Sequence, residues 1–184
     1  MASRINADSS NGLQLVSDSS GEVQIQSNGV TVATINSSGL SMNSGTLAGN
    51  GPAFAAYQSS SQSINSGAYY KTNFQSEFFD TDDCYDTTNS RFLPTVAGYY
   101  YVSATIMSTG PTGHHNAFAV NGTIVRYGGN ISNLSTYGVC NTALIYLNGS
   151  TDYVEYYTLF SGNQTINVSV PAASWFCGNL VRAA

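Results

Sequence analysis

Four carboxylates lie close together in the sequence and form its main acidic cluster: Asp80, Asp82, Asp83 and Asp86. Carboxylate oxygens are the hard ligands that calcium prefers, so Asp80, Asp82 and Asp83 are the candidate metal ligands. The cluster lacks the glycine and the closing glutamate of a helix-loop-helix calcium loop. A solvated acidic turn that leads into Tyr85 explains the same residues without any metal. Both interpretations stay open, and no other cofactor is expected.

The only two histidines are adjacent, at His114 and His115. Adjacent side chains on a strand or loop point in opposite directions, so both cannot reach one metal or one catalytic centre. They follow the turn-like Gly-Pro-Thr-Gly of residues 110–113, which predicts a solvated loop over residues 109–116. A metal or pH-sensing role for the histidines is the alternative.

Catalytic patterns are missing from the sequence. It contains no Gly-x-Ser-x-Gly, no phosphate-binding loop and no His-Glu-x-x-His. Asp152 and Glu155 are three residues apart in a strand-like pattern, so they face opposite sides and do not form an acid–base pair. We therefore expect a protein that is not an enzyme.

The three cysteines, Cys84, Cys140 and Cys177, are widely spaced and include no Cys-x-x-Cys pair. This pattern favours small buried thiols over a disulfide framework or a zinc site. One bridge with one cysteine left over is the alternative.

Charge and hydropathy exclude two classes of partner. Only five residues are Lys or Arg and the net charge is −5, which disfavours binding to nucleic-acid phosphates. No apolar run approaches the ~20 residues of a membrane span, and the first residues contain no apolar stretch of a signal peptide. Charged residues make up 8% of the chain, so small polar side chains or contacts between subunits must cover its surface.

Aromatic residues divide the chain into two parts. Residues 1–51 contain no Phe, Tyr or Trp, and every aromatic lies at Phe54 or beyond. In the first part, residues 13–16, 23–26 and 30–35 alternate apolar and polar side chains, and Asn28-Gly29 is typical of a tight hairpin turn. We expect a β-rich stem or attachment segment over residues 1–50 and a second domain over residues 51–184.

Strands this short cannot enclose a core of their own. They need neighbours, most simply the same segment of other chains, and a floppy tail is the alternative. Residues 45–52 are rich in glycine and predict a linker.

The second part predicts a β-sandwich or jelly roll. Strand-like patterns recur over residues 99–106, 117–120, 141–147, 153–160 and 166–170, with Gly, Asn and Ser between them. No segment keeps a helical period over three turns. The fold class is therefore all-β.

Several strands carry aromatics on both faces, as in Tyr99-Tyr100-Tyr101 and Tyr156-Tyr157. A single sandwich buries one face of each strand and leaves the other rings outside. Burial between subunits removes that exposure, because tyrosine is amphipathic and enriched at interfaces. We expect Tyr100, Tyr156 and Phe54 to lie at subunit contacts.

Four stretches of the second part, in order, resemble the globular head of complement component 1q, a family related to the tumour necrosis factor fold. They are Ala-Phe-Ala-Ala at residues 53–56, Tyr85-Asp86 followed by residues 91–102, residues 143–154, and Ser-Trp-Phe-Cys-Gly-Asn-Leu at residues 174–180. The stretches keep the family's order and spacing, apart from one residue inserted before Asp152. The resemblance implies a jelly roll that assembles as a homotrimer around its aromatic strands. The family's ligand-binding loops do not carry over, because the sequence departs from the pattern after Val102.

A second resemblance covers residues 12–29, which look like segments of bacteriophage fibre and virion proteins, particularly those of phages that infect cyanobacteria. A thin β-rich stem followed by a trimeric knob is the plan of a viral fibre. The resemblance implies a virion protein whose first segment docks to other virion proteins.

Two function classes follow. The leading hypothesis is a phage fibre or appendage on the virion surface whose knob binds a glycan or protein of the host cell. Residues 109–116 and 128–137 are rich in Gly, Ser, Asn and Tyr, which suit adaptable contacts, so His114, His115, Asn130 and Tyr137 are the candidate receptor-facing residues. A capsid decoration or cement protein is a close variant, and a secreted soluble recognition protein is the rival class.

Overall fold

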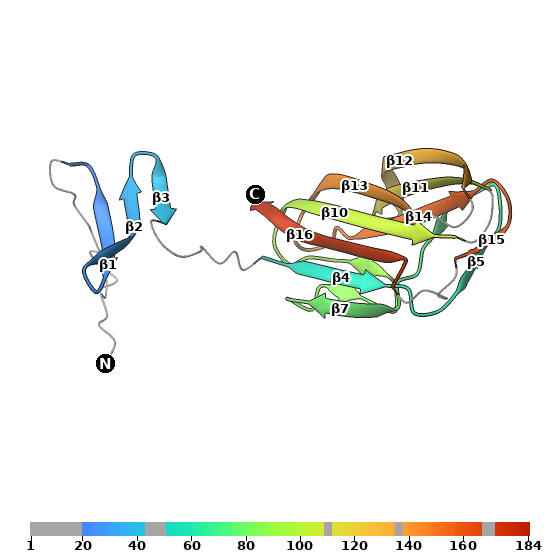
Figure 1. Ribbon diagram of the computed structural model, residues 1–184, viewed down its shortest axis with the longest axis horizontal. Coiled ribbons are helices and arrows are strands. Elements are labelled where there is room, and N and C mark those ends of the chain that lie inside the picture. Colours follow the sequence, from blue (N-terminus) through green and yellow to red (C-terminus); the bar gives the residue numbers. More distant parts are fainter. Residues whose placement is uncertain (1–19, 43–50, 109–111, 135–137, 167–171) are drawn as a thin grey trace. The chain divides into compact units, whose positions relative to one another are not determined.

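A computed structural model describes residues 20–42, 51–108, 112–134, 138–166 and 172–184. The chain divides into two compact units, residues 1–49 and residues 50–184. Each unit is described by itself, and the second is called the head (Figure 1).

The described part of the first unit is a three-stranded antiparallel sheet in the order β1-β2-β3. Its strands are β1 (Val23–Ser27), β2 (Val30–Asn36) and β3 (Gly39–Met42). Asn28 and Gly29 join β1 to β2 with φ values of 51° and 75°, which confirms the predicted hairpin turn. The strand expected at residues 13–16 lies outside the described residues.

The described part of the head is built from strands, as the alternating patterns predict. They are β4 (Ala53–Tyr57), β5 (Gln62–Ile64), β6 (Tyr70–Lys71), β7 (Ser76–Asp80), β8 (Tyr85–Asp86), β9 (Arg91–Phe92), β10 (Gly98–Met107), β11 (Thr112–Val120), β12 (Thr123–Leu134), β13 (Gly138–Leu147), β14 (Val154–Phe160), β15 (Gln164–Ile166) and β16 (Trp175–Ala183). None of the described residues belongs to a helix long and apolar enough to cross a membrane.

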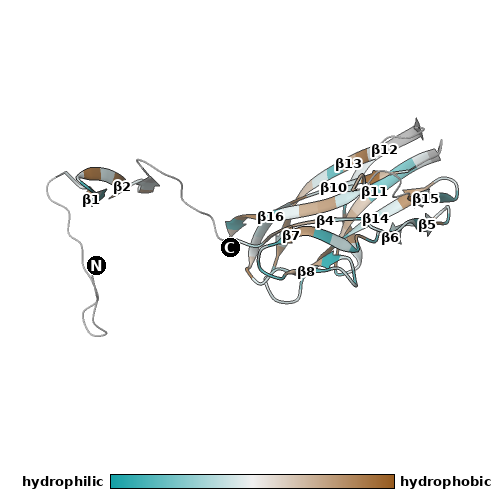
Figure 2. Cartoon of the chain, turned by 60° about the horizontal axis from the view of Figure 1, so that its bottom comes forward, coloured by the Kyte–Doolittle hydropathy of each residue, from teal (hydrophilic) through white to brown (hydrophobic). Residues whose placement is uncertain are grey.

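Two antiparallel sheets form the layers of the head. One has the order β13-β10-β16-β4-β7, and the other has the order β12-β11-β14-β9-β8 with β6 paired to β14. Neighbouring strands in each sheet are often distant in sequence, so the chain crosses repeatedly from one sheet to the other. This arrangement is a jelly roll, and hydrophobic segments recur along its strands (Figure 2).

Aromatic rings fill the space between the two sheets. Phe54 lies at the centre, with ring centroids 4.4 Å from Phe92 and 4.8 Å from both Tyr85 and Phe176. Phe74, Phe118 and Tyr156 continue this cluster. The core of the head is therefore an aromatic core made by one chain.

Two segments expected to be loops are strands. Residues 112–120 form β11, which pairs with β12 on one side and β14 on the other. Residues 128–134 belong to β12, so the Gly- and Asn-rich sequence forms one arm of a long hairpin rather than a receptor loop. Pairing of β11 with β14, and of β12 with β11, overrides the weak local preference of these residues for turns.

Candidate functional site

The three aromatics assigned to subunit contacts lie elsewhere. Tyr100, Tyr156 and Phe54 are fully buried in the core of one chain, so that prediction is wrong. Strand alternation explains the error, because Tyr100 is the inward-pointing member of Tyr99-Tyr100-Tyr101. Its hydroxyl donates to the Val96 carbonyl at 2.6 Å, and burial raises the pKa of Tyr100 to about 12.

Tyr99 and Tyr101 point to the opposite side of β10 and remain 45% and 44% exposed. Tyr99 pairs with Tyr146, Tyr101 pairs with Leu144, and these β13 side chains are also exposed. At the other edge of the sheet, Phe78 and Phe79 of β7 are exposed. A β-bulge, at which Ala55 pairs with Phe79 and Ala56 with Glu77, leaves Phe78 as an extra residue, so both rings lie on the outer side. We call the exposed face formed by these six side chains the aromatic face.

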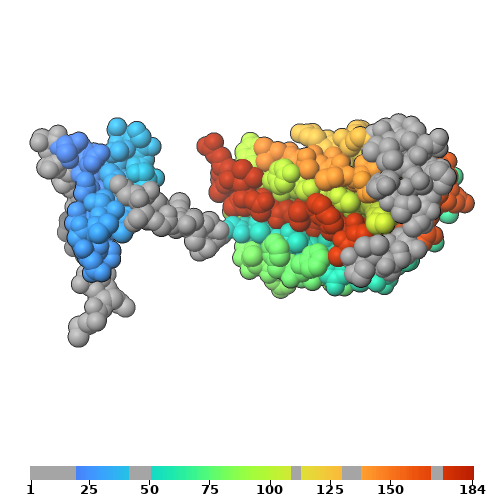
Figure 3. All heavy atoms as spheres, in the orientation of Figure 1, coloured from blue at the N-terminus to red at the C-terminus, as the bar shows by residue number. Residues whose placement is uncertain are grey.

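The aromatic face lies on the outer side of the sheet β13-β10-β16-β4-β7. Its register places four rows of side chains across the sheet: Tyr146, Tyr99 and Arg182; Leu144, Tyr101, Asn179 and Ala53; Thr142, Ser103, Cys177, Ala55 and Phe79; and Cys140, Thr105, Trp175, Tyr57 and Ser76. Within these rows of described residues, Arg182 is the one charged side chain. Figure 3 shows β16, in red, crossing this face beside β4, β10 and β13.

Ring contacts hold parts of the aromatic face in place. Tyr99 and Tyr146 meet edge to face at 5.5 Å, and Tyr57 lies 4.6 Å from Phe78 between ring centroids. A surface of packed rings whose described rows contain Arg182 as their one charged side chain is suited to burial against another protein surface.

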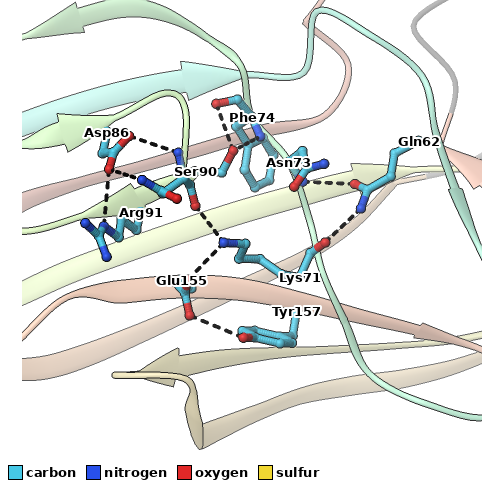
Figure 4. A network of polar contacts seen from close by, with 10 residues as sticks. Gln62, Lys71, Asn73, Phe74, Asp86, Ser90, Arg91, Glu155 and Tyr157 are labelled. Atoms are coloured by element: carbon cyan, nitrogen blue, oxygen red, sulfur yellow. Dashed lines mark hydrogen bonds and ion pairs between the residues drawn. The ribbon is translucent and has the colours of Figure 1, made fainter.

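The other sheet carries a polar network with a buried ion pair (Figure 4). Lys71 Nζ of β6 lies 3.3 Å from Glu155 Oε1 of β14, and the Glu155 side chain is only 6% exposed against 33% for Lys71. Lys71 Nζ also donates to the Asn89 carbonyl at 2.9 Å, and the Tyr157 hydroxyl donates to Glu155 Oε2 at 3.3 Å. Burial, reinforced by the Glu155 charge, raises the pKa of Tyr157. These contacts link β6 to β14.

The acidic cluster does not assemble a metal site in the part of the chain that the structure describes. No three His, Cys, Asp or Glu side chains come together there to hold an ion. Asp80 instead caps the turn after β7, because its Oδ2 accepts from the Tyr85 backbone N–H at 2.6 Å and its Oδ1 from that of Asp82 at 3.4 Å. Asp83 has a positive φ of 53°, as expected at a tight turn. This geometry is that of the acidic turn.

Asp86 makes a separate local group with Asn89 and Arg91. Its carboxylate accepts from the Asn89 side chain at 2.7 Å and backbone N–H at 2.9 Å, and lies 3.3 Å from Arg91 Nε. The side-chain hydrogen bond from Asn89 is the main reason that the pKa of Asp86 is lowered. The Arg91 guanidinium also lies over the Tyr153 ring, 4.9 Å from its centroid.

Neither histidine lies on an exposed loop. His114 is buried within β11, its ring centroid is 4.6 Å from that of Phe160, and its Nε2 has no hydrogen-bond partner. Burial lowers the pKa of His114 to about 4. His115 is half-buried on the other side of the strand and pairs with Asn130 of β12. His114 is therefore wrong as a receptor-facing residue, and Tyr137 lies outside the described residues.

An open polar cleft lies where β5 pairs with β15. It has a volume of about 330 Å³ and is lined by Ser63, Ile64, Asn65, Asn163, Gln164 and Thr165. Asn163 Oδ1 accepts from the Ser66 backbone N–H at 2.8 Å, and the hydroxyls of Ser63 and Thr165 lie 3.4 Å apart. The sequence alone does not reveal this cleft, because its two walls are 97 or more residues apart along the chain.

A second cleft, of about 260 Å³, lies at the other edge of the sandwich and is lined by Val120, Val125, Arg126, Ile145 and Tyr146. It joins the β13 edge of the aromatic face to the β12 hairpin arm. The Arg126 guanidinium donates to the neighbouring Val125 carbonyl at 2.8 Å.

All three cysteines are free thiols, so the alternative of one disulfide bridge is not formed. Cys84 is buried as expected, Cys177 is half-buried and Cys140 is exposed. The prediction of small buried thiols is therefore wrong for Cys140.

No family model and no curated protein matches this chain. Solved structures do. The globular domain of zebrafish complement 1qA is 16% identical with a TM-score of 0.51, and the match covers 73% of this chain and 99% of that one. Murine APRIL crystallised at pH 5.0 is 7% identical with a TM-score of 0.56, covering 71% of this chain and 99% of that one. These similarities show the fold, and they confirm the all-β jelly roll of the second part.

Proposed function

We propose that this chain is a structural protein of a bacteriophage virion, a homotrimeric fibre or appendage whose head binds the host cell surface. The resemblance of residues 12–29 to phage fibre proteins supports the virion assignment. The jelly-roll head and its aromatic face support the trimer. The aromatic face is the single observation that carries the homotrimer, because a free monomer would expose all of it to water.

A subunit contact through the aromatic face would bury the apolar rings and still leave the tyrosine hydroxyls able to form hydrogen bonds. Tyrosine rings bury apolar area while their hydroxyls reach water or a hydrogen-bond partner at the margin. The rows between Tyr99 and Phe79 contain small or uncharged side chains, so a neighbouring subunit can pack on them without desolvating a charge. Arg182 is exposed and lies in the first row, at the margin of the face, where a charge stays hydrated.

Host contact is assigned to the polar cleft between β5 and β15. These strands lie at the end of the head opposite to the one where β4 begins and β16 ends (Figure 1). The amides of Asn65, Asn163 and Gln164 both donate and accept hydrogen bonds, which matches the paired donor and acceptor character of sugar hydroxyls. An uncharged cleft on a chain of net charge −5 favours a neutral glycan over an anionic one.

A trimer would present three weak binding clefts to the same cell surface. Each cleft is open, so a single one holds a ligand loosely, whereas three clefts on one rigid head engage a glycan-covered surface together. Linkage of this kind raises overall affinity by ~10²–10⁴ without any new contact. The first segment docks the trimer to the particle, at the virion surface.

Antibody labelling of purified phage particles, viewed by electron microscopy, tests the virion assignment. Label at tail appendages supports a fibre, whereas label spread evenly over the capsid identifies a decoration protein. Particles without label, with the chain found free in the medium, would contradict a virion role and favour a secreted recognition protein.

Adsorption measurements test the cleft in the same particles. Gln164→Ala should slow adsorption to host cells without changing particle yield, because it removes one amide from the cleft wall. Thr123→Ala, at the exposed start of β12, is the matched control and should leave adsorption unchanged.

A further inference from the structure

The three-stranded sheet of the first unit has one apolar face. Val23 of β1 pairs with Ile35 of β2, which in turn pairs with Leu40 of β3. Ile25 pairs with Ala33, and Ser27 with Val30. Directly paired residues and residues two apart along a strand share a face, so these side chains lie together. We call the face formed by Val23, Ile25, Val30, Ala33, Ile35 and Leu40 the stem face.

The opposite face of the same sheet is polar and internally bonded. Thr31 Oγ1 donates to Gln24 Oε1 at 2.9 Å, and Gln26 Nε2 lies 3.3 Å from both Gln24 Oε1 and Thr31 Oγ1. These three side chains therefore satisfy one another on the polar side. The two faces differ in chemistry as the two sides of a half-buried sheet do.

The described residues of this unit provide no second layer over the stem face. Ile25, Val30, Ile35 and Leu40 are all exposed, and Val30 reaches 60%, whereas the small side chain of Ala33 is buried. Only Glu22 is charged among residues 20–42, so the surface offers nothing to a partner that is recognised by charge. Three short strands with an uncovered apolar face are marginal on their own and need a complementary apolar surface.

We propose that the stem face is covered by the stem faces of the other chains of the same trimer, which meet around a common axis. The inference rests on the trimer of the proposed function. A surface of aliphatic side chains without charges is complementary to another copy of itself. The trimeric heads hold the three segments at high effective concentration, so a contact too weak to form between separate chains forms within the trimer. The first segment then has its own apolar core.

Cysteine cross-linking in the full chain tests this contact directly. The exposed and half-buried native thiols are removed by Cys140→Ser and Cys177→Ser, while the buried Cys84 stays. In that background, Ile35→Cys places a thiol at the middle strand of the stem face, and Gln24→Cys places one on the polar face as the matched control. A short bis-maleimide should link chains of the Ile35→Cys variant about ten-fold more than those of the Gln24→Cys variant. Equal linking, or none, would overturn the proposal.

Hydrogen exchange supplies a second reading that needs no cross-link. Leu40→Asp places like carboxylates in an apolar contact, so amides of β1 and β2 should exchange about ten-fold faster or more. Gln26→Asp on the polar face should leave them unchanged, and equal rates in both variants would contradict the proposal.

The solution mass of the same samples shows whether a negative result contradicts the stem contact or the trimer itself. A trimeric mass without cross-links overturns the stem contact alone. A monomeric mass overturns the trimer, and a monomeric mass without cross-links overturns both.

Discussion

Buried ionisable side chains set how the head responds to acid and to mutation. His114 and Glu155 lie on neighbouring strands of the same sheet, but their environments differ. Glu155 has Lys71 and Tyr157 as partners, whereas His114 Nε2 has none. The partners of Glu155 compensate the burial of its carboxylate, whereas burial of His114 without a partner for Nε2 favours the neutral ring.

The neutral His114 predicts a loss of stability in mild acid. The unfolded chain takes up a proton near pH 6.5, and the folded chain does so only near pH 4. Between these values the unfolded state binds more protons, so the free energy of unfolding falls as the pH falls, by about 3 kcal/mol in total. Thermal melting from pH 7 to pH 4 should show this loss, and His114→Leu should remove most of it. His115→Leu is the control and should keep it, and an unchanged acid profile in His114→Leu would contradict the assignment.

The ion pair between Lys71 and Glu155 gives a second prediction at this scale. Lys71→Met leaves the buried carboxylate without its partner and should lower the free energy of unfolding by about 3 kcal/mol, since Lys71 is itself partly exposed. The double variant with Glu155→Gln should recover most of that loss. Denaturant titration of Lys71→Met, Glu155→Gln and the double variant measures the coupling, and additive losses would show that the pair does not stabilise the head.

Turns are determined by residues next to one another in the sequence, whereas the orientation of a strand depends on its pairing with distant strands. Asn-Gly turns are local, and both Asn28-Gly29 and Asn121-Gly122 adopt the positive φ values that their residues allow. Strand identity was predictable from alternation for β10 and β13. The inward face of Tyr99-Tyr100-Tyr101 was not, because all three side chains are the same and their orientation depends on register with β13 and β16. The cleft between β5 and β15 depends in the same way on pairing between distant segments.

Substitutions at two glycines in Asn-Gly turns should distinguish the cost of backbone strain from the cost of steric crowding. Gly149 has a φ of 70°, and a side chain there would meet the backbone of Val96 and Ala97. Gly122 has a similar φ of 75°, but a side chain there would enter open space. We expect Gly122→Ala to cost about 1–2 kcal/mol from strain alone and Gly149→Ala about 3 kcal/mol, because the crowding adds to it. Denaturant titration compares the two, and equal losses would contradict the predicted clash.

At the scale of the whole molecule, the two units are expected to have different roles: the head trimerises and binds the host cell, and the first unit docks to the particle. The aromatic core and the aromatic face are made entirely of head residues, so a chain that begins at Gly51 should fold and keep the trimer. It should also adsorb to host cells, yet fail to enter particles because the docking segment is gone. Incorporation at the level of the full chain would place the docking surface on the head instead.

Burial of the aromatic face between subunits predicts a trimer, so the solution mass of the full chain should be that of three chains. Sedimentation equilibrium over a wide dilution series should give the mass of three chains. Tyr101→Ser together with Leu144→Ser, on the aromatic face, should shift the chain toward monomer without lowering its β-sheet signal. Tyr70→Ser, at an exposed tyrosine of β6 in the other sheet, is the matched control and should remain trimeric. A folded wild-type chain that sediments as a monomer at every concentration would contradict burial of the aromatic face between subunits.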